Sequence, residues 1–272
     1  MIFTIADLHL PLGIDKPMDV FGQSWDNYVE RLRDGWQASV GVDDTVVLPG
    51  DFSWATYLEE SKKDFDFLES LNGNKIILKG NHDYWWTTMS KLNEFLDNNG
   101  YKTISFLHNN SYEAEGISIC GTRGWLYPGF SGYKESSEKY FMREVIRLEN
   151  SLKTAKTDEI YVFTHYPPMS NMCEGNDFID MMKKYNVKKC FYGHLHGKSH
   201  ENKIREEYDG IKYYLISSDY LKFSPKRIKY ILHGKQDFTI ESSEIIMNLL
   251  KFTITYKTTF PIGKKMNINN SP

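Results

Sequence analysis

Cysteine is scarce in this sequence of 272 residues, and its three copies form no C-x-x-C pair. An odd number of cysteines without paired spacing argues against a disulfide framework and against a zinc ribbon. Cys120 and Cys190 lie in apolar, β-like runs, a pattern typical of buried and unreactive thiols. We therefore expect a reducing, cytoplasmic environment.

Long hydrophobic runs are missing as well. No stretch of about 18 apolar residues occurs, so the sequence predicts no membrane-spanning helix. The N-terminal run MIFTIADLHL carries neither a basic leader nor a small-residue cleavage site, and Asp7 and His9 interrupt it. We expect no signal peptide and no membrane partner.

Neither sign of charge dominates. Lys and Arg total 33, Asp and Glu total 36, and the formal net charge is -3. A protein that coats nucleic acid by bulk charge would be strongly basic, so we expect no duplex nucleic acid as a partner. Aromatic residues are plentiful instead, and hydrophobic residues make up 40% of the chain, which is typical of a globular protein.

Two hydrophobic periods alternate along the chain, which predicts an α/β layered fold. Short β-branched or aromatic runs predict buried strands at 2–5, 45–48, 75–78, 117–120, 160–164, 190–192 and 212–217. Apolar residues at helical spacing predict helices near 25–36, 58–71, 88–96, 140–152 and 178–185. Ser136 or Ser137 is a plausible cap for the fourth of these helices.

Chemically active side chains follow the predicted strands at the points where the strands end. Five strands run into Asp, Asn or His, often beside a glycine that allows a sharp turn. Ligand sites of open α/β sheets form beyond the carboxyl ends of strands, so we expect these side chains to converge. The candidates are Asp7, His9, Asp51, Asn81, His165, His194 and His196.

The candidate set contains only oxygen and imidazole donors, with no thiolate among them. Such a mixture suits Mn, Fe, Zn or Ni rather than a structural zinc site. Seven candidates exceed what one tetrahedral ion needs, whereas two ions sharing one carboxylate would use all of them. A pair of ions roughly 3.5–4 Å apart is a known arrangement for hydrolysing phosphate esters.

The motifs that carry these residues resemble those of the calcineurin-like metallophosphoesterases. The blocks D-x-H, G-D, G-N-H-D, an isolated His and G-H-x-H stand in the family's order at 7–9, 50–51, 80–83, 165 and 193–196. The longer strings IADLHL, DKPMDVFG, PGDFSWA, KGNHDYWW, GTRGW and SSDYLKF resemble a bacterial subfamily of phosphohydrolases without an assigned substrate. The resemblance covers about residues 1 to 230 and implies a metallophosphoesterase domain there. Residues 231–272 would be a C-terminal extension of unknown role.

The resemblance also implies a fold, a mechanism and a role for each ligand. The fold is an αββα sandwich, in which two mixed β-sheets are flanked by helices. One divalent metal ion would be bound by Asp7, His9, Asp51 and His196, and a second by Asp51, Asn81, His165 and His194. A hydroxide bridging the two ions would attack phosphorus in line, while His82 would hydrogen-bond the phosphoryl oxygen or protonate the leaving group.

One block departs from the Ser/Thr protein phosphatase branch of the family. That branch continues its G-D block with further Asp and Arg residues, whereas this chain reads Gly50-Asp51-Phe52-Ser53-Trp54. Trp54 stands where that branch has the Asp that orients the catalytic His. A protein phosphatase role is therefore disfavoured, and whether Asp83 acts on His82 is left open.

Two residues are candidates for binding the substrate, which we expect to be a small phosphorylated molecule. Arg123, between glycines after a predicted strand, has a side chain that can bind phosphate with two hydrogen bonds, or pair with a carboxylate instead. Trp54 has an aromatic face that can stack on a base or sugar, or pack beneath the site.

Two other functions compete with a phosphohydrolase acting on a small monoester or diester. A nuclease of the same superfamily could bind a short single strand on its aromatic residues. A binding scaffold could keep the fold without the chemistry, although such a protein would be expected to have lost ligands, and here every ligand position is filled.

Overall fold

The computed structural model describes residues 1–228 except 17, 19, 21, 128, 129, 131, 173 and 174. The predicted extension at 231–272 lies outside the described residues. The domain boundary near 230 therefore stays a prediction.

The strands of the described residues form two mixed sheets. The first has five strands in the order β11-β1-β2-β3-β4, and the second has six in the order β5-β6-β7-β8-β10-β9. Within each sheet the inner strands are parallel, and only β11, β5 and β9 run antiparallel to their neighbours. The bounds in the first sheet are β1 Ile2–Thr4, β2 Thr45–Pro49, β3 Asn74–Leu78, β4 Ile104–Phe106 and β11 Lys226–Arg227. Those in the second are β5 Tyr112–Ala114, β6 Ile117–Thr122, β7 Glu159–Thr164, β8 Lys189–Tyr192, β9 Glu207–Tyr208 and β10 Ile211–Leu215.

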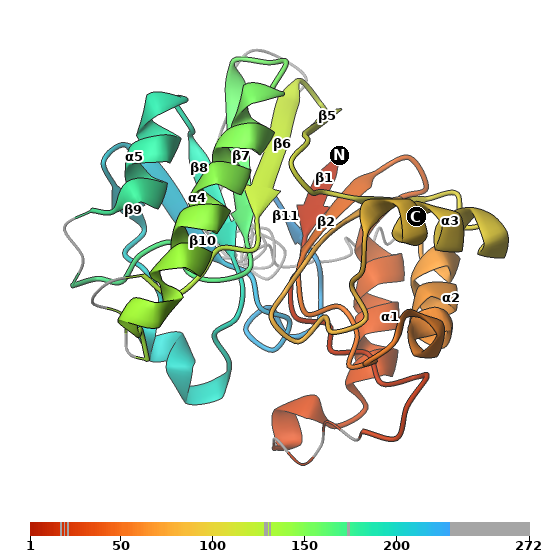
Figure 1. Ribbon diagram of the computed structural model, residues 1–272. Helices are drawn as coiled ribbons and strands as arrows, with labels where there is room; N and C mark the ends of the chain where they lie inside the picture. Colours follow the sequence, from red (N-terminus) through yellow and green to blue (C-terminus); the bar gives the residue numbers. More distant parts are fainter. Residues whose placement is uncertain are drawn as a thin grey trace, which may run out of the picture. The chain divides into compact units, whose positions relative to one another are not determined.

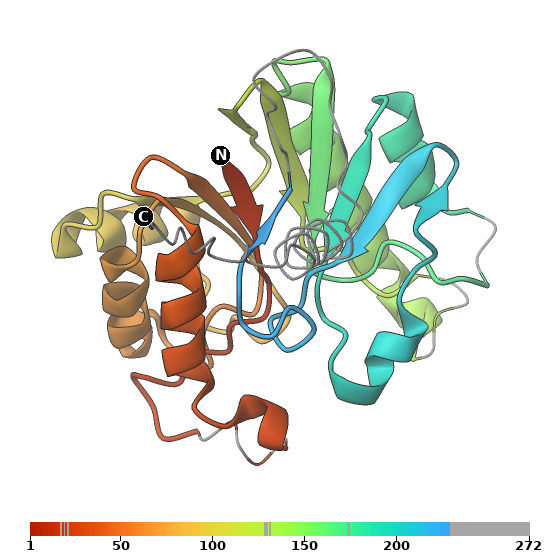
Figure 2. The same cartoon turned by 180° about the vertical axis from the view of Figure 1, so that it is seen from behind.

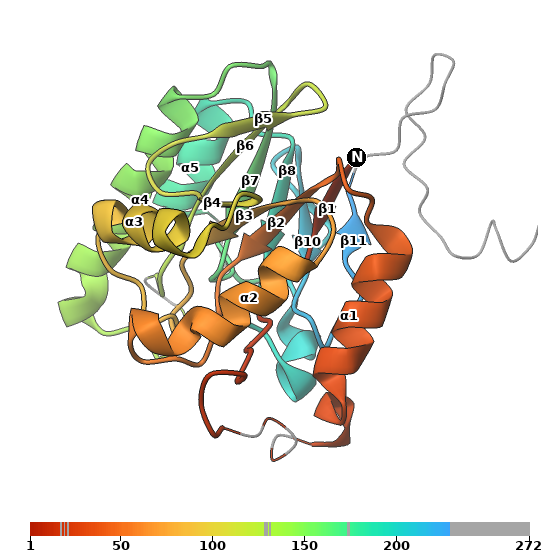
Figure 3. The ribbon, with the colours of Figure 1, turned by 90° about the vertical axis from the view of Figure 1, so that its right-hand side faces the viewer.

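Helices cover the outer face of each sheet (Figures 1 and 2). The helices α1 Tyr28–Ser39, α2 Lys62–Ser70 and α3 Met89–Asn99 lie on the first sheet, and α4 Glu138–Lys153 and α5 Asp177–Lys184 lie on the second. Figure 3 shows the first sheet from the side of α1 and α2, with β11 beside β1. Short 3-10 helices occupy Gln23–Trp25, Leu58–Ser61, Glu135–Ser137 and Gly197–Asn202. The predicted αββα sandwich is confirmed.

Three apolar layers follow from the two-residue period of the strands. On β2, Val46 and Leu48 pack under the helices of the first sheet, while Val47 faces the second sheet. On β7, Val162 packs under α4 and α5, while Phe163 faces the first sheet. Because both faces of each inner strand are buried, these strands read as continuous apolar runs in the sequence.

The seven predicted strands are confirmed as β1, β2, β3, β6, β7, β8 and β10. The strands β4, β5, β9 and β11 were not predicted, because they have two or three residues and lie at or near sheet edges. The predicted cap is only partly right. Ser137 precedes α4, but its side chain accepts no capping hydrogen bond, because a 3-10 turn leads into the helix instead.

Candidate metal centre

The parallel strands bring all seven predicted ligands to one edge of the sandwich. Asp7, Asp51 and Asn81 follow β1, β2 and β3 of the first sheet, while His165 and His194 follow β7 and β8 of the second. Hydrogen-bond or ion-pair distances link each of the seven side chains to at least one other, and none lies apart from the cluster. The seven side chains therefore converge, as the strand ends predicted.

The first half of the cluster comprises Asp7, His9 and His196, each of which offers one ligand atom within 4.8 Å of the others. The Nε2 atoms of His9 and His196 are 3.4 Å apart. Asp7 Oδ1 lies 3.7 Å from Nε2 of His196. These three side chains are the ones assigned, with Asp51, to one metal in the prediction.

The second half comprises Asp7, Asp51 and His165, whose ligand atoms likewise lie within 4.8 Å of one another. Nε2 of His165 is 2.6 Å from Oδ1 of Asn81 and 3.3 Å from Nδ1 of His194. Oδ2 of Asp51 lies 3.5 Å from His165 Nε2 and 3.8 Å from Nε2 of His9. Asp51 thus contacts both halves, as a bridging carboxylate must.

The backbone is left-handed at four of the seven candidates. The φ angles are 60° at Asp7, 47° at His9, 51° at Asp51 and 72° at His194. Positive φ is uncommon for residues other than glycine, and residues held in such conformations cluster at functional sites. Each of these four residues therefore turns sharply just beyond its strand, so that its side chain points into the shared site.

Two ring nitrogens are held by partners outside the cluster. Nδ1 of His165 lies 3.1 Å from the carbonyl oxygen of Pro49, and Nδ1 of His196 lies 2.9 Å from Oδ1 of Asp219. When Nδ1–H is donated to such a partner, Nε2 is the atom that faces the site, as in metal-ligating histidines generally. Asp219 was missed from the sequence, although it follows the end of β10 as the other candidates follow their strands.

The charges of this cluster fit divalent cations. Burial raises the pKa of Asp51 well above its ordinary value, and the negative charges of Asp83 and Asp7 raise it further. Burial should lower the pKa of His196, but Asp219 and Asp7 together raise it to about 10, so a proton sits among the carboxylates. A metal ion would take the place of that proton and neutralise the carboxylates.

Two other imidazoles are neutral and ready to bind. Burial lowers the pKa of His165 to about 3 and that of His194 to about 4. Nδ1 of His9 is buried and has no hydrogen-bond partner in the described part of the chain, while its Nε2 faces the cluster. Two carboxylates, one amide and four imidazoles form a donor set suited to Mn, Fe, Zn or Ni.

Asp83 braces the loops that carry these ligands. Its Oδ1 accepts hydrogen bonds from the backbone N–H groups of Phe52 and Ser53 and from Nε1 of Trp85. Its Oδ2 accepts from the N–H groups of Asp51 and Gly80. Both oxygens are thus occupied by other groups, which answers the open question: Asp83 holds the loops and is not the hydrogen-bond partner of His82.

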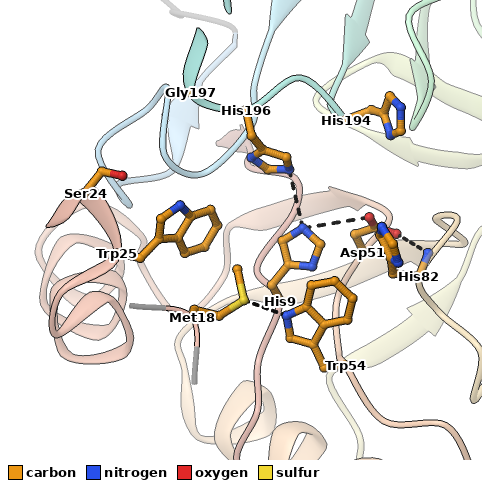
Figure 4. A pocket seen from close by; sticks show the side chains of 10 residues that line it. All are labelled: His9, Met18, Ser24, Trp25, Asp51, Trp54, His82, His194, His196 and Gly197. Atoms are coloured by element: carbon orange, nitrogen blue, oxygen red, sulfur yellow. Dashed lines mark hydrogen bonds and ion pairs between the residues drawn. The ribbon is translucent and has the colours of Figure 1, made fainter. Parts of the chain in front are cut away.

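His82 faces a pocket beside the cluster (Figure 4). Its backbone N–H donates to Oδ1 of Asp51 over 2.8 Å, and its ring centroid lies 4.6 Å from that of Trp54. Burial lowers the pKa of His82, and the nearby charge of Lys16 lowers it further. The pocket encloses about 350 Å³ and is lined by His9, Met18, Ser24, Trp25, Asp51, Trp54, His82, His194, His196 and Gly197.

Trp54 lines this pocket, but both faces of its ring are covered. The ring of His9 stacks on one face at 4.5 Å, and the Lys16 ammonium lies 3.3 Å from the ring centroid. A base can stack on Trp54 only if Lys16 moves away, so the predicted substrate role of Trp54 stays a prediction. Trp25, which was not singled out from the sequence, lines the same pocket, with its ring 5.7 Å from that of His196.

Arg123 is not among the residues that line this pocket. Its Nη2 lies 3.3 Å from Oε1 of the buried Glu144, and its guanidinium stacks on Trp125 at 4.4 Å. Of the two alternatives weighed for Arg123, the structure contains the carboxylate pair. Its predicted substrate role stays a prediction.

Residues 2–198 match the family model of the calcineurin-like phosphoesterases. The chain belongs to this family. That membership confirms the resemblance found in the sequence motifs. It also confirms that the protein is a metal-dependent phosphoesterase. Calcineurin-like phosphoesterases use divalent metals, and the cluster offers candidate ligands for them.

No curated protein matches this phosphoesterase at a significant level. Among solved structures, a phosphopantetheinyl hydrolase from Mycobacterium tuberculosis is 13% identical with a TM-score of 0.50, over 86% of this chain and 98% of that one. A protein of unknown function from Aquifex aeolicus is 15% identical with a TM-score of 0.46, over 83% and 94%. The phosphopantetheinyl hydrolase has the same fold.

Within the described residues, no helix is both long and apolar enough to cross a bilayer.

Proposed function

We propose that this phosphoesterase binds two divalent metal ions and hydrolyses a small phosphomonoester or phosphodiester. The observation that carries the proposal is the pair of ligand groups that share Asp7 and are both contacted by Asp51, beside a pocket that His82 faces. A second ion needs a second set of donors and a carboxylate between the sets, and the cluster offers both.

The seven predicted ligands would hold the ions as the family pattern assigns them. When bound, divalent ions neutralise the phosphoryl oxygens and lower the pKa of the water that attacks phosphorus in line. Asp219 orients the ring of His196, and Asp83 fixes the loops that carry Asp51 and Asn81. Because these partners are in place before substrate arrives, little reorganisation is needed during the reaction.

His82 is the residue proposed to act on the substrate itself. Its ring lies at the pocket, half-buried, and is not within hydrogen-bonding distance of a carboxylate among the described residues. A ring held this way is free to donate a hydrogen bond to a phosphoryl oxygen or to protonate the leaving group.

The dimensions of the pocket support a small substrate. A volume of about 350 Å³ is near the lower end of small-molecule sites. Trp25 and Met18 give one side of the pocket an apolar wall, which suits the organic part of an ester.

We also propose a cytoplasmic location, supported by the buried free thiols of Cys120 and Cys190.

The first experiment measures hydrolysis of p-nitrophenyl phosphate and bis-p-nitrophenyl phosphate by purified protein with added Mn²⁺. We expect turnover of at least one of them, and its loss after chelation of the metal. If neither is hydrolysed with Mn²⁺, Fe²⁺, Zn²⁺ or Ni²⁺, the proposal fails. A screen of phosphomonoesters, cyclic nucleotides, short oligonucleotides and a phosphopantetheinyl ester then defines the substrate class.

Variants separate the roles of the two central residues. His82→Ala should lower kcat about 100-fold while metal content is unchanged, since proton transfer by a positioned side chain contributes at least that factor. Equal activity would remove His82 from the mechanism.

Asp51→Asn should reduce the occupancy of both ions, as measured by elemental analysis, with Asp97→Asn on the exposed side of α3 as the matched control. Two full sites in Asp51→Asn would contradict the bridging role.

A further inference from the structure

A second, smaller cavity lies at the same edge of the sandwich, where β3, β4 and β6 end. Three cationic side chains line it, those of Lys79, Arg123 and Arg147, and His108 lines it as well. Neither the mechanism proposed above nor the family match assigns a role to this cavity. We call it the cationic cavity.

Positive charge exceeds negative charge in the cationic cavity. Among the described residues, Glu144 is the one carboxylate that lines it, and it is fully buried. Its oxygens accept hydrogen bonds from Thr122 Oγ1 at 2.6 Å, from Arg147 Nη1 at 2.6 Å and from Arg123 Nη2 at 3.3 Å. Two arginines therefore share a single carboxylate, and Lys79 adds a third positive charge.

Two donors at this cavity have no acceptor among the residues that the structure describes. Lys79 makes no hydrogen bond or ion pair with the described part of the chain, and Nε of Arg123 is buried without a partner. Asp83 attracts Lys79 electrostatically, but backbone and indole N–H groups occupy its two oxygens. Nε of Arg123 is a buried donor, and such donors are rarely left without an acceptor, whereas Lys79 is only half-buried. Crowded like charges are unfavourable unless an anion lies among them.

The size of the cavity limits what enters it. It encloses about 20 Å³, which is room for one water-sized group. An oxyanion would place one oxygen inside and keep the rest of its volume at the mouth. Arginine and lysine side chains arranged in this way are suited to phosphate, which accepts several charge-assisted hydrogen bonds.

The cationic cavity and the candidate metal centre share their framework. Lys79 precedes Asn81 by two residues, so their Cα atoms lie within about 7 Å of each other. The carbonyl oxygen of Arg123 accepts hydrogen bonds from the N–H groups of His165 and Tyr166, at 3.1 and 2.9 Å. An anion in the cavity would therefore lie close to the metal centre.

We propose that the cationic cavity binds a phosphate-type oxyanion through Lys79, Arg123 and Arg147. The oxyanion is either a second phosphate group of the substrate or a free anion such as inorganic phosphate. Only the first of these two sources rests on the function proposed above, and the experiment separates them.

The first arm measures binding of inorganic phosphate to metal-free protein by calorimetry, at constant ionic strength and with a chelator present. We expect Lys79→Gln and Arg147→Gln to weaken binding about tenfold each, since each removes a charge-assisted hydrogen bond. The matched controls are Lys91→Gln on α3 and Arg143→Gln on α4, which are exposed and do not line the cavity. Absence of phosphate binding, or equal weakening in test and control variants, overturns the proposal. Because no described group pairs with Lys79 and Arg123 repels it, Lys79→Gln should unfold at a temperature no lower than that of the wild type.

The second arm uses metal-loaded enzyme and compares kcat/KM for a bisphosphorylated ester with that for its monophosphorylated counterpart. If the oxyanion is part of the substrate, the wild type prefers the bisphosphorylated ester, and Lys79→Gln loses about tenfold of that preference, measured as the ratio of the two kcat/KM values. Equal preference in both proteins, with phosphate binding intact in the first arm, identifies a free anion as the ligand. If the enzyme hydrolyses nothing, the first arm alone decides on the cavity, so the two proposals fail separately.

Discussion

Replacing Asp83 with asparagine is the sharpest test of how the candidate metal centre is held together. The side chain keeps its shape and loses its charge, and one of its two oxygens becomes an NH₂ group. In the best orientation, the remaining oxygen still accepts from Phe52, Ser53 and Trp85. The new NH₂ group then faces the N–H groups of Asp51 and Gly80, whose nitrogen atoms lie 2.9 and 2.6 Å from Oδ2 in the wild type.

The expected loss of stability follows from the two hydrogen bonds that the asparagine cannot accept. Two buried N–H groups lose their acceptor and meet another donor, and each unsatisfied group costs about 1–3 kcal/mol. Removing the charge of Asp83 also relieves its repulsion of Asp51, which offsets part of that loss. We expect Asp83→Asn to lower the free energy of unfolding by about 2–4 kcal/mol.

Urea unfolding of the metal-free protein measures this difference, with Asp97→Asn on α3 as the control for the same chemical change at an exposed position. The control should stay within about 0.5 kcal/mol of the wild type. If Asp83→Asn also stays within that range, the five hydrogen bonds to Asp83 do not hold the loops, and our account of the site is wrong.

Three further changes test other parts of the structure. Asp219→Asn should weaken metal binding about 10- to 100-fold, because it removes the carboxylate that orients His196, and calorimetry that finds unchanged affinity would contradict that role. Burial raises the pKa of the Asp64 carboxyl to about 7, so between about pH 4 and pH 7 the folded chain keeps a proton that the unfolded chain has lost. The stability that Asp64 contributes should therefore be greatest below about pH 4 and be lost as pH rises through about 7. Unfolding curves of Asp64→Asn at pH 5 and pH 8 should show a smaller fall in stability than the wild type, and an identical fall would exclude Asp64 as its source. Phe163→Ala, between the two sheets, should cost about 3–5 kcal/mol of unfolding free energy, and a loss below about 1 kcal/mol would mean that the layer between the sheets repacks.

The convergence of the candidate ligands could be predicted from the sequence because parallel strands impose strict geometry. Asp7, Asp51 and His165 each follow an apolar run, and parallel strands of one sheet end at the same edge. Strand direction brings Asp7 and Asp51 together within the first sheet, and the packing of the second sheet on the first brings His165 to them.

The remaining features depend on how distant segments dock. Trp25 reaches the pocket from a 3-10 turn before α1, although its spacing from Tyr28 and Leu32 matched the helix itself. Glu144 meets Arg123 because α4 packs beside the end of β6, and nothing in the sequence around either residue fixes that contact. Docking of this kind is determined by the packing of side chains over the whole layer.

The left-handed turns at Asp7, His9, Asp51 and His194 carry a consequence for the evolution of this chain. Glycine adopts such turns with less strain than a residue that has a Cβ atom, so each ligand position carries a cost of about 1 kcal/mol. Selection for thermal stability favours relief of this strain, although at His9 it also favours keeping the ring that packs on Trp54, whereas selection for chemistry retains the imidazole. The two pressures oppose each other at the four positions, and directed evolution for heat resistance should therefore screen every round for metal content.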